Sequence, residues 1–567
     1  MNLESLAFSP PSSETGSIGS RLAEALPGAG NATGDRNFPW AAGKETKFAQ
    51  QRVYLDSFDW RLWRAGWILE TVQAGNGWQW RLFPRPGASP SSSNGGKKKE
   101  NPYQEFRGRL NSSRKQYAAE HLPDGPIADR IRPLIGIRAL LPRLELDIQG
   151  RELPLVDGRQ KTVVRLRQQR RHLRNPLWAA AAEQAGAEVT LEDPLLLKSV
   201  RGFEKPLRQV AAYFTENGWQ TQPTSTLLSD FEALELEPGQ DPARYVLTID
   251  PEAPAGQVTR DVFLTLLDNM ESCLDGCLAG WDTEFLHDFR VAIRRTRSIQ
   301  GQMRLLFQGP TYDRFRQSFR WLGGLTGPTR DLDVLHLKLA GYQAGLPVAV
   351  QQSLGDLDRY LERHEAQVRR KMVRSLRTQR AQRLLLDWRT WLLAGTESQQ
   401  TVAAEVPVSQ IAAARIWKIY RRVLKKGKAL TPQSPAEGLH EVRLDCKKLR
   451  YLMEMYRGAF PGSIRRCIRV LKGLQDNLGD FNDYEVHQVL FRAEALQAVE
   501  KKAASEQILL AVGRLLEVLD QRQQGEREAF AGRFREFATD DHQRWFRDLF
   551  RRPAKQAEKA LEAAHRA

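Results

Sequence analysis

Two segments of the chain place a histidine and three basic residues at the same helical spacing. In each, the basic residues follow the histidine at positions +3, +7 and +10, and the second segment lies 153 positions after the first. The first set is His287, Arg290, Arg294 and Arg297, and the second is His440, Arg443, Lys447 and Arg450. With about 100° between successive helical residues, each set falls within about 80° of arc. Guanidinium and ammonium groups on one stripe bind oxyanions, so the pattern predicts a duplicated anion-binding surface.

The same two helices have an apolar side, which indicates that they pack into a helical core. Its residues are Leu286, Phe289 and Ile293 in the first copy and Leu439, Val442 and Cys446 in the second. Arg295 and Lys448 add to the basic side. Like charges at neighbouring helical positions repel by about a few tenths of a kcal/mol per pair. A stripe that is cationic throughout therefore favours an anionic ligand that relieves this repulsion.

The duplication extends into the segments that follow, where we align the two halves with an offset of 149. This alignment predicts a connection four residues shorter in the second half. It matches Arg316 with Arg465 and Arg320 with Arg469, and Lys472 lies beside the second of these pairs. We include all five in the predicted anion-binding surface.

Two further basic groups have helical spacing. Arg415, Lys418, Arg422 and Lys425 repeat the +3, +7 and +10 pattern on the helix before the second histidine. The corresponding helix of the first half, at 261–278, is acidic, so the two halves cannot contribute equally. Arg370, Arg374 and Arg377 share a narrow arc within a dense basic run. An exposed helix face is the alternative for both groups, and we interpret them as additional anion contacts.

Composition limits the compartment and the partners. The chain of 567 residues has 85 Lys and Arg against 68 Asp and Glu, a net charge of +17, which favours polyanions such as nucleic acid, inorganic polyphosphate or anionic lipid. The four cysteines are too few for a disulfide framework, and Cys273 and Cys277 are expected in the core rather than on a metal. We find neither a secretory signal nor an apolar run that could span a membrane, so we expect a soluble cytoplasmic protein.

The residues that could suggest catalysis have a simpler explanation. Asp331, Asp333, Asp480 and Asp483 lie near the predicted ends of helical segments, where carboxylates cap helices or orient arginines. We therefore predict no catalytic residue, no metal ligand and no cofactor.

Local patterns divide the chain into a β-rich and a helical part, an α+β protein of two domains. Short alternating runs between residues 52 and 168 predict antiparallel strands, and residues 176–187 and 205–217 are predicted helices. Beyond about residue 258, helical periods separated by short loops predict antiparallel bundles. The expected divisions are a disordered tail at 1–45, a β-rich domain at 46–220, a linker at 221–257, helical bundles at 258–400 and 401–555, and a tail at 556–567.

At both histidine helices the sequence resembles the conserved histidine α-helical domain, or CHAD, family. The strings WLGGL and TRDLDVL at 321–325 and 329–335, and LKGLQD and GDFND at 471–476 and 479–483, extend the resemblance over about residues 258–550. The resemblance implies two four-helix bundles related by a pseudo-two-fold axis, with basic side chains around a central cavity. It also implies binding of inorganic polyphosphate, without known chemistry. Polyphosphate granules are a candidate partner on which the sequence is silent.

The N-terminal part more loosely resembles the CYTH domain of adenylate cyclases and thiamine triphosphatases. The matching strings are YLDSFDWRL at 54–62 and KTVVRL at 161–166. In that family an opening strand with alternating glutamates holds divalent metal. Here this strand is expected to be missing, which argues against turnover of a triphosphate by the N-terminal domain. From this resemblance we retain only Lys161 and Arg165, as phosphate contacts.

Three functions compete on this evidence. The leading hypothesis is a non-enzymatic polyphosphate-binding protein. The alternatives are a metal-dependent triphosphatase or cyclase, which the absence of the acidic strand argues against, and a nucleic-acid-binding protein. The basic faces lack the interleaved aromatic residues that stack on single-stranded bases, which argues against the last of these.

Overall fold

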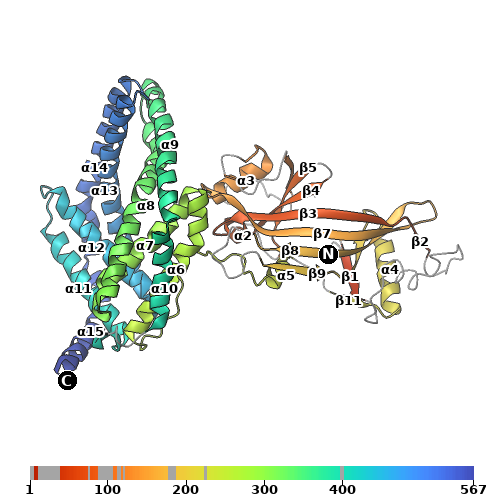
Figure 1. Cartoon of the computed structure of the whole chain (residues 1–567), viewed down its shortest axis with the longest axis horizontal. Coiled ribbons are helices and arrows are strands. Elements are labelled where there is room, and N and C mark those ends of the chain that lie inside the picture. The colour runs from red at the N-terminus through yellow and green to blue at the C-terminus, as the bar shows by residue number, and fades with distance from the viewer. Residues whose placement is uncertain are drawn as a thin grey trace. The chain divides into compact units, whose positions relative to one another are not determined.

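The structure is a computed structural model that describes residues 5–9, 39–74, 77–86, 106–110, 117–118, 122–176, 187–222, 227–395 and 401–566. The chain forms two compact units, residues 1–242 and 243–567. The first is β-rich and the second is helical, as the sequence patterns predict (Figure 1). The α+β class with two domains is therefore confirmed. No helix among the described residues contains an apolar stretch of the length that a bilayer crossing requires.

The N-terminal unit is built on an antiparallel sheet. In the described residues its strands follow the order β11-β1-β10-β8-β7-β3-β4-β5-β6, with β2 paired to β7 and β9 to β8. The strands are β1 (Ser5–Ser9), β2 (Ala41–Ala42), β3 (Thr46–Ser57), β4 (Trp67–Ala74), β5 (Gly77–Pro84), β6 (Phe106–Leu110), β7 (Leu140–Val156), β8 (Thr162–Arg174), β9 (Glu188–Glu192), β10 (Leu195–Ser199) and β11 (Gln220–Gln222). The helices of this unit are α2 (Arg61–Arg64), α3 (Pro126–Ile135), α4 (Glu204–Glu216) and α5 (Leu227–Ala233). Alternating side chains on β7 and β8 supply much of its core.

Two predictions for the N-terminal unit need correction. The expected tail at 1–45 includes β1, which pairs with β10 and β11 and buries Phe8. The described residues of this strand carry no carboxylate. The expected linker at 221–257 contains α5, whose Phe231 packs against Trp60 and Trp63, because apolar residues there complete the core. The helix predicted at 205–217 is α4, whereas the one at 176–187 lies almost wholly outside the described residues.

The helical unit repeats one order of helices twice. The first half consists of α6 (Ala255–Ala279), α7 (Thr283–Gln302), α8 (Pro310–Gln343), α9 (Val348–Leu376) and α10 (Gln379–Ala394). The second consists of α11 (Val408–Ala429), α12 (Ala436–Met455), α13 (Ile464–Glu500), α14 (Gln507–Phe537) and α15 (Asp540–Arg566). In each half only two residues separate the last two helices, so the plan is close to that of a four-helix bundle. The predicted C-terminal tail at 556–567 instead continues α15 to Arg566, because Ala557 is buried.

Packing within and between the halves follows the same repeat. α10 packs back on α6, and α15 packs back on α11, which closes each bundle. The halves meet through equivalent helices, α6 with α11, α7 with α12, α8 with α13 and α9 with α14, as a two-fold relation requires. A shared apolar core that includes Leu335, Leu357, Phe491 and Leu515 joins α8, α9, α13 and α14 (Figure 1). Helices that are far apart in the sequence are thereby fixed against one another.

Candidate polyanion-binding site

The two histidine helices, α7 and α12, contact each other at the centre of the helical unit. Their apolar sides face the core as predicted, with Phe289 and Ile293 buried on α7 and Val442 and Cys446 buried on α12. Asp282 caps α7, since its carboxylate accepts the backbone N–H groups of Glu284 and Phe285. The basic stripes are therefore held by two packed helices of fixed rotation.

A cavity of about 650 Å³ lies between the two copies of the motif. Its wall includes His287, Arg294 and Arg295 from α7 and Arg450 from α12. Arg465 at the start of α13 also lines it, together with Arg457 just after α12. Basic residues from both halves thus converge on one hollow, although His440 is not part of its wall.

Arg294 and Lys447 are the least compensated cations at this junction. Neither forms an ion pair with any residue in the described parts of the chain, and the buried Nε–H of Arg294 has no hydrogen-bond partner there. Burial lowers the pKa of Lys447 to about 8, and the positive charges of Arg443 and Arg294 lower it further than Asp483 raises it. The pKa of Arg443 is also lowered, by burial above all and to a lesser degree by Arg294. The geometry therefore concentrates positive charge that Asp483 offsets only in part.

His287 is oriented by a residue that the sequence patterns did not assign to the site. Arg330 of α8 donates to its Nδ1 at 2.9 Å and to the carbonyl oxygen of Thr283 at 3.2 Å. Because a guanidinium can only donate, Nδ1 of His287 is the acceptor and its neutral ring carries the proton on Nε2. Arg330 lies in the TRDLDVL string, but only the folded chain shows that it faces the histidine.

His440 has a different environment, so the two histidines are not equivalent. Its Nε2 lies 3.2 Å from Oε2 of Glu485, and its ring contacts that of Phe481. The position that corresponds to Arg330 is occupied by Asn482. The second histidine is therefore engaged by an acid instead of an arginine, and it contributes less to an anion site.

The offset of 149 between α8 and α13 is wrong, and the structural offset is 152. Buried positions match along both helices at this spacing, for example Phe319 with Leu471 and Leu339 with Phe491. The charged partners agree as well. Asp331 is close enough to Arg290 to oppose the lowering of the Arg290 pKa by burial. At the matching positions of the second half, Arg443 lies 3.6 Å from Asp483. The two offsets differ by three residues, which is almost one helical turn. A shift of this size leaves the direction of the buried face nearly unchanged, so similar short strings match at either offset.

Some predicted contacts serve the fold. Nη1 of Arg290 donates to the carbonyl oxygen of Gly323 and to Oγ1 of Thr326, both at 2.9 Å, and so joins α7 to α8. Arg316 pairs with Asp313 at 2.9 Å and Lys472 with Asp476 at 3.5 Å. These side chains are partly neutralised before any ligand arrives.

A buried carboxylate compensates much of the basic face formed by α11 and α12. Asp445 lies 2.7 Å from Arg422, 3.1 Å from Lys426 and 3.2 Å from Lys448. In a similar way Glu454 lies 3.3 Å from Arg295 and 2.6 Å from Arg450. Arg415, Lys418 and Lys425 have no ion pair with described residues, and burial alone lowers the pKa of Arg415.

The remaining predicted cations lie apart from the main cavity wall. Arg370, Arg374 and Arg377 line a separate recess of about 530 Å³ beside the C-terminal end of α6 at Gly280. A helix C-terminus carries partial negative charge, which stabilises cations there. Burial lowers the pKa of Arg297, and the positive charge of nearby Arg320 lowers it further. Arg469 lies on α13 and has no ion pair with a described residue.

In the N-terminal unit the two predicted phosphate contacts differ. Lys161 is exposed at a turn, where its backbone N–H donates to Asp157. Arg165 is paired with Glu152 at 2.5 Å, so much of its charge is already compensated. Sequence patterns missed Lys198 on β10, whose pKa is lowered to about 8 by burial and by nearby Arg167 and Arg52. The strands therefore gather cations whose proximity the sequence did not indicate.

Comparison with known proteins identifies the helical part. Residues 261–492 match the model of the CHAD domain family. Curated protein sequences gave no significant match. The crystal structure of the CHAD domain from the plant Ricinus communis has a TM-score of 0.44 and 23% identity, over 52% of this chain and 96% of that one.

Two other solved structures are more distant. PptA from Streptomyces chartreusis has a TM-score of 0.37 and 16% identity, over 50% of this chain and 100% of its own. A protein from Bacillus halodurans, proposed to be an adenylate cyclase, has a TM-score of 0.22 and 16% identity, over 38% and 90% of the two chains. With all TM-scores below 0.5, the family assignment rests on the sequence model. The matched residues 261–492 contain both histidine helices, so this part of the chain is similar to the CHAD domain family.

Proposed function

We propose that this protein binds inorganic polyphosphate in the cavity between α7 and α12 and performs no chemistry on it. The observation that carries the proposal is the pair Arg294 and Lys447, half-buried cations from the two halves that form no ion pair with a described acid. Removing such charges from water is unfavourable unless an opposite charge accompanies them. A polyanion in the cavity would supply that charge.

The chemistry of the cavity favours a phosphate chain over a nucleic acid. Guanidinium groups such as that of Arg294 in the cavity wall bind phosphate oxygens in forked pairs. Lys447 is not part of this wall, but it lies close enough to Arg294 to add a compact point charge beside it. Recognition of single strands relies on aromatic rings on which bases stack. Two tyrosines line the cavity, and the hydroxyl of Tyr245 donates to the carbonyl oxygen of Met455 at 2.8 Å, which fixes that side chain. A ligand made of phosphates alone can bind to guanidinium and ammonium groups and needs no stacking surface.

The absence of turnover is part of the proposal and is supported by how the cavity's polar groups are engaged. Glu454 is held between Arg295 and Arg450, and Nδ1 of His287 accepts from Arg330. A general base needs a free lone pair within reach of the proton that it abstracts. The groups best placed for this role are already occupied.

The test is a binding titration of the full chain with long-chain polyphosphate carrying a fluorescent end label. We expect saturable binding at moderate salt, with affinity that falls steeply as salt rises, as for other polyanions. Unlabelled polyphosphate should compete better than single-stranded RNA or DNA of equal charge. Absence of binding, or stronger competition by nucleic acid, would contradict the proposal. Release of phosphate from triphosphate in the presence of Mg²⁺ or Mn²⁺ would contradict its non-enzymatic part.

Asp445→Asn should change stability and binding in opposite directions. The substitution removes the charge shared by Arg422, Lys426 and Lys448, whose mutual repulsion then destabilises the fold by about 2 kcal/mol, less than for a fully buried pair because the cations are partly exposed. The same loss frees Arg422 and Lys448 for phosphate, and affinity should rise about fivefold, or about 1 kcal/mol.

Thermal unfolding with and without polyphosphate measures both effects. Asp548→Asn serves as the control, since this exposed aspartate lies 3.8 Å from Arg547 alone. It should leave both quantities nearly unchanged. Weaker binding by Asp445→Asn would show that Arg422 and Lys448 do not face the ligand.

A further inference from the structure

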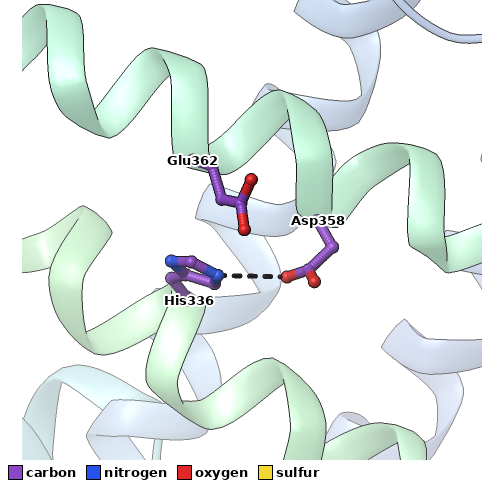
Figure 2. A group of neighbouring side chains, drawn as sticks. All are labelled: His336, Asp358 and Glu362. Atoms are coloured by element: carbon purple, nitrogen blue, oxygen red, sulfur yellow. Dashed lines mark ion pairs between the residues drawn. The ribbon is translucent and has the colours of Figure 1, made fainter. Parts of the chain in front are cut away.

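A second cluster of chemically capable side chains lies between α8 and α9, at residues that none of the basic patterns includes. His336 projects from α8 toward Asp358 and Glu362 of α9 (Figure 2). One ligand atom from each of the three side chains lies within 4.8 Å of the others. Within the described residues, this is the one group of three or more His, Cys, Asp or Glu side chains that meets this spacing.

The helices hold the three side chains in place. Asp358 and Glu362 are four residues apart, so they project from one face of α9. Leu335 precedes His336 and is fully buried, and Leu357 and Leu361 are buried beside the two acids. The apolar core between α8 and α9 therefore fixes the rotation of both helices, and with it the direction of the cluster.

The distance between His336 and Asp358 matches that between two ligands of one metal ion. Nε2 of His336 lies 3.3 Å from Oδ1 of Asp358. Two ligands of a tetrahedral zinc ion, each at about 2.0 Å from the metal, are about 3.3 Å apart. A carboxylate oxygen of the exposed Glu362 lies within 4.8 Å of the other two ligand atoms, so it is placed to complete a three-ligand set with a fourth position for water.

A fourth residue outside this set orients the histidine. Nδ1 of His336 lies 3.2 Å from Oε2 of Glu365, and Glu365 is in turn 3.4 Å from Arg369. When Nδ1–H donates to this carboxylate, the lone pair of Nε2 is directed at Asp358. Metal-binding histidines are commonly held in this way by a carboxylate on the opposite ring nitrogen.

The charge balance distinguishes the cluster from an ordinary ion pair. Asp358 has no ion-pair partner other than His336 among the described residues, and Glu362 has none there at all. Arg359, the nearest cation in sequence, pairs with Asp356 instead. Two carboxylates and an imidazole thus share a small volume without a strong cation, although the protein as a whole has a net charge of +17.

We propose that His336, Asp358 and Glu362 bind a divalent transition-metal ion, with Zn²⁺ as the preferred ion. One imidazole and two carboxylates suit Zn²⁺ better than Mg²⁺, which prefers oxygen ligands and retains its water. The ion would bridge α8 and α9 and stabilise this part of the first bundle. This site is independent of the proposed polyphosphate cavity, whose wall includes none of the three ligands.

The experiment is a calorimetric titration of the chelator-treated full chain with ZnCl₂, repeated with Co²⁺ for its visible absorption. We expect one tight site, a higher melting temperature with metal, and a Co²⁺ spectrum typical of low coordination. His336→Ala should weaken this site at least about 100-fold, and Glu365→Gln about 10-fold to 100-fold through loss of the orienting bond. Exposed Glu362→Gln tests the site if the histidine variant does not fold.

The matched control is His364→Ala. His364 lies on the same helix and pairs with Glu494 at 2.7 Å, but the structure shows no third ligand beside it in the described residues. The tight site and its Co²⁺ spectrum should survive in this variant. Equal metal affinity of the wild type, His336→Ala and Glu362→Gln would overturn the proposal, as would the lack of a one-to-one site in the wild type.

Discussion

Replacing Arg294 and Lys447 together with alanine is expected to weaken polyphosphate binding about 100-fold, which corresponds to about 2.7 kcal/mol. These side chains come from equivalent positions of α7 and α12, and neither has an acidic partner in the described residues. Their charges are partly buried, where an ion pair with phosphate is stronger than at an exposed surface. The folded protein should become no less stable, since the substitution removes repulsion and breaks no ion pair.

The control for this variant removes two charges elsewhere. Arg551 and Lys555 are exposed on α15, so the double substitution Arg551→Ala and Lys555→Ala changes the net charge equally. It should lower affinity only slightly through the long-range field. An equal loss in both variants, measured by titration at the same salt concentration, would mean that total charge and not the cavity determines binding. Arg290→Ala is a poor test because Arg290 holds α7 against α8.

Polyphosphate affinity should also fall about tenfold between pH 7 and pH 9, and further toward pH 10. In the free protein Lys447 has a pKa of about 8 instead of its ordinary 10.5, owing first to burial and then to Arg443 and Arg294. Bound phosphate favours the charged amine, so the pKa rises on binding and protons are taken up. Above pH 8 the free protein must gain a proton to bind, and each pH unit then costs about a factor of ten.

The same shift has the opposite sign for stability. Between about pH 8 and 10.5 the unfolded chain retains the Lys447 proton and the folded protein does not, so this residue makes the unliganded fold more stable as pH rises. Lys447→Arg keeps its charge over this range and should bind polyphosphate with nearly constant affinity from pH 8 to 10. A variant that retains the full pH dependence would assign the titration to another group.

Much of the site was predictable because it depends on local periodicity. The spacing of His287, Arg290 and Arg294 defines a face of one helix, and apolar residues beside them require that the helix pack. Repetition of this pattern at His440 predicts a second such helix. The helical unit confirms both, with Phe289 and Val442 buried at matching positions.

The predictions that were wrong depend on contacts between segments distant in sequence. An alignment of α8 with α13 that was wrong by three residues still matched short strings, since a helix nearly repeats its direction after three or four positions. Likewise the first residues of the chain contain little periodicity, and β1 is recognised as a strand only through its pairing with β10 and β11.

The sequence by itself determined the two basic helices, the division into β-rich and helical units, and the duplication within the second. Only the tertiary structure decided which cations remain uncompensated. Asp445 reaches Arg422 from another helix, Arg330 reaches His287, and Lys447 meets Arg294 across the two halves. Charge interactions depend on distance and burial, which packing sets between residues that the sequence keeps far apart. The sequence therefore predicted which types of side chain surround the cavity. It did not predict which of them are paired with acids or have shifted pKa values.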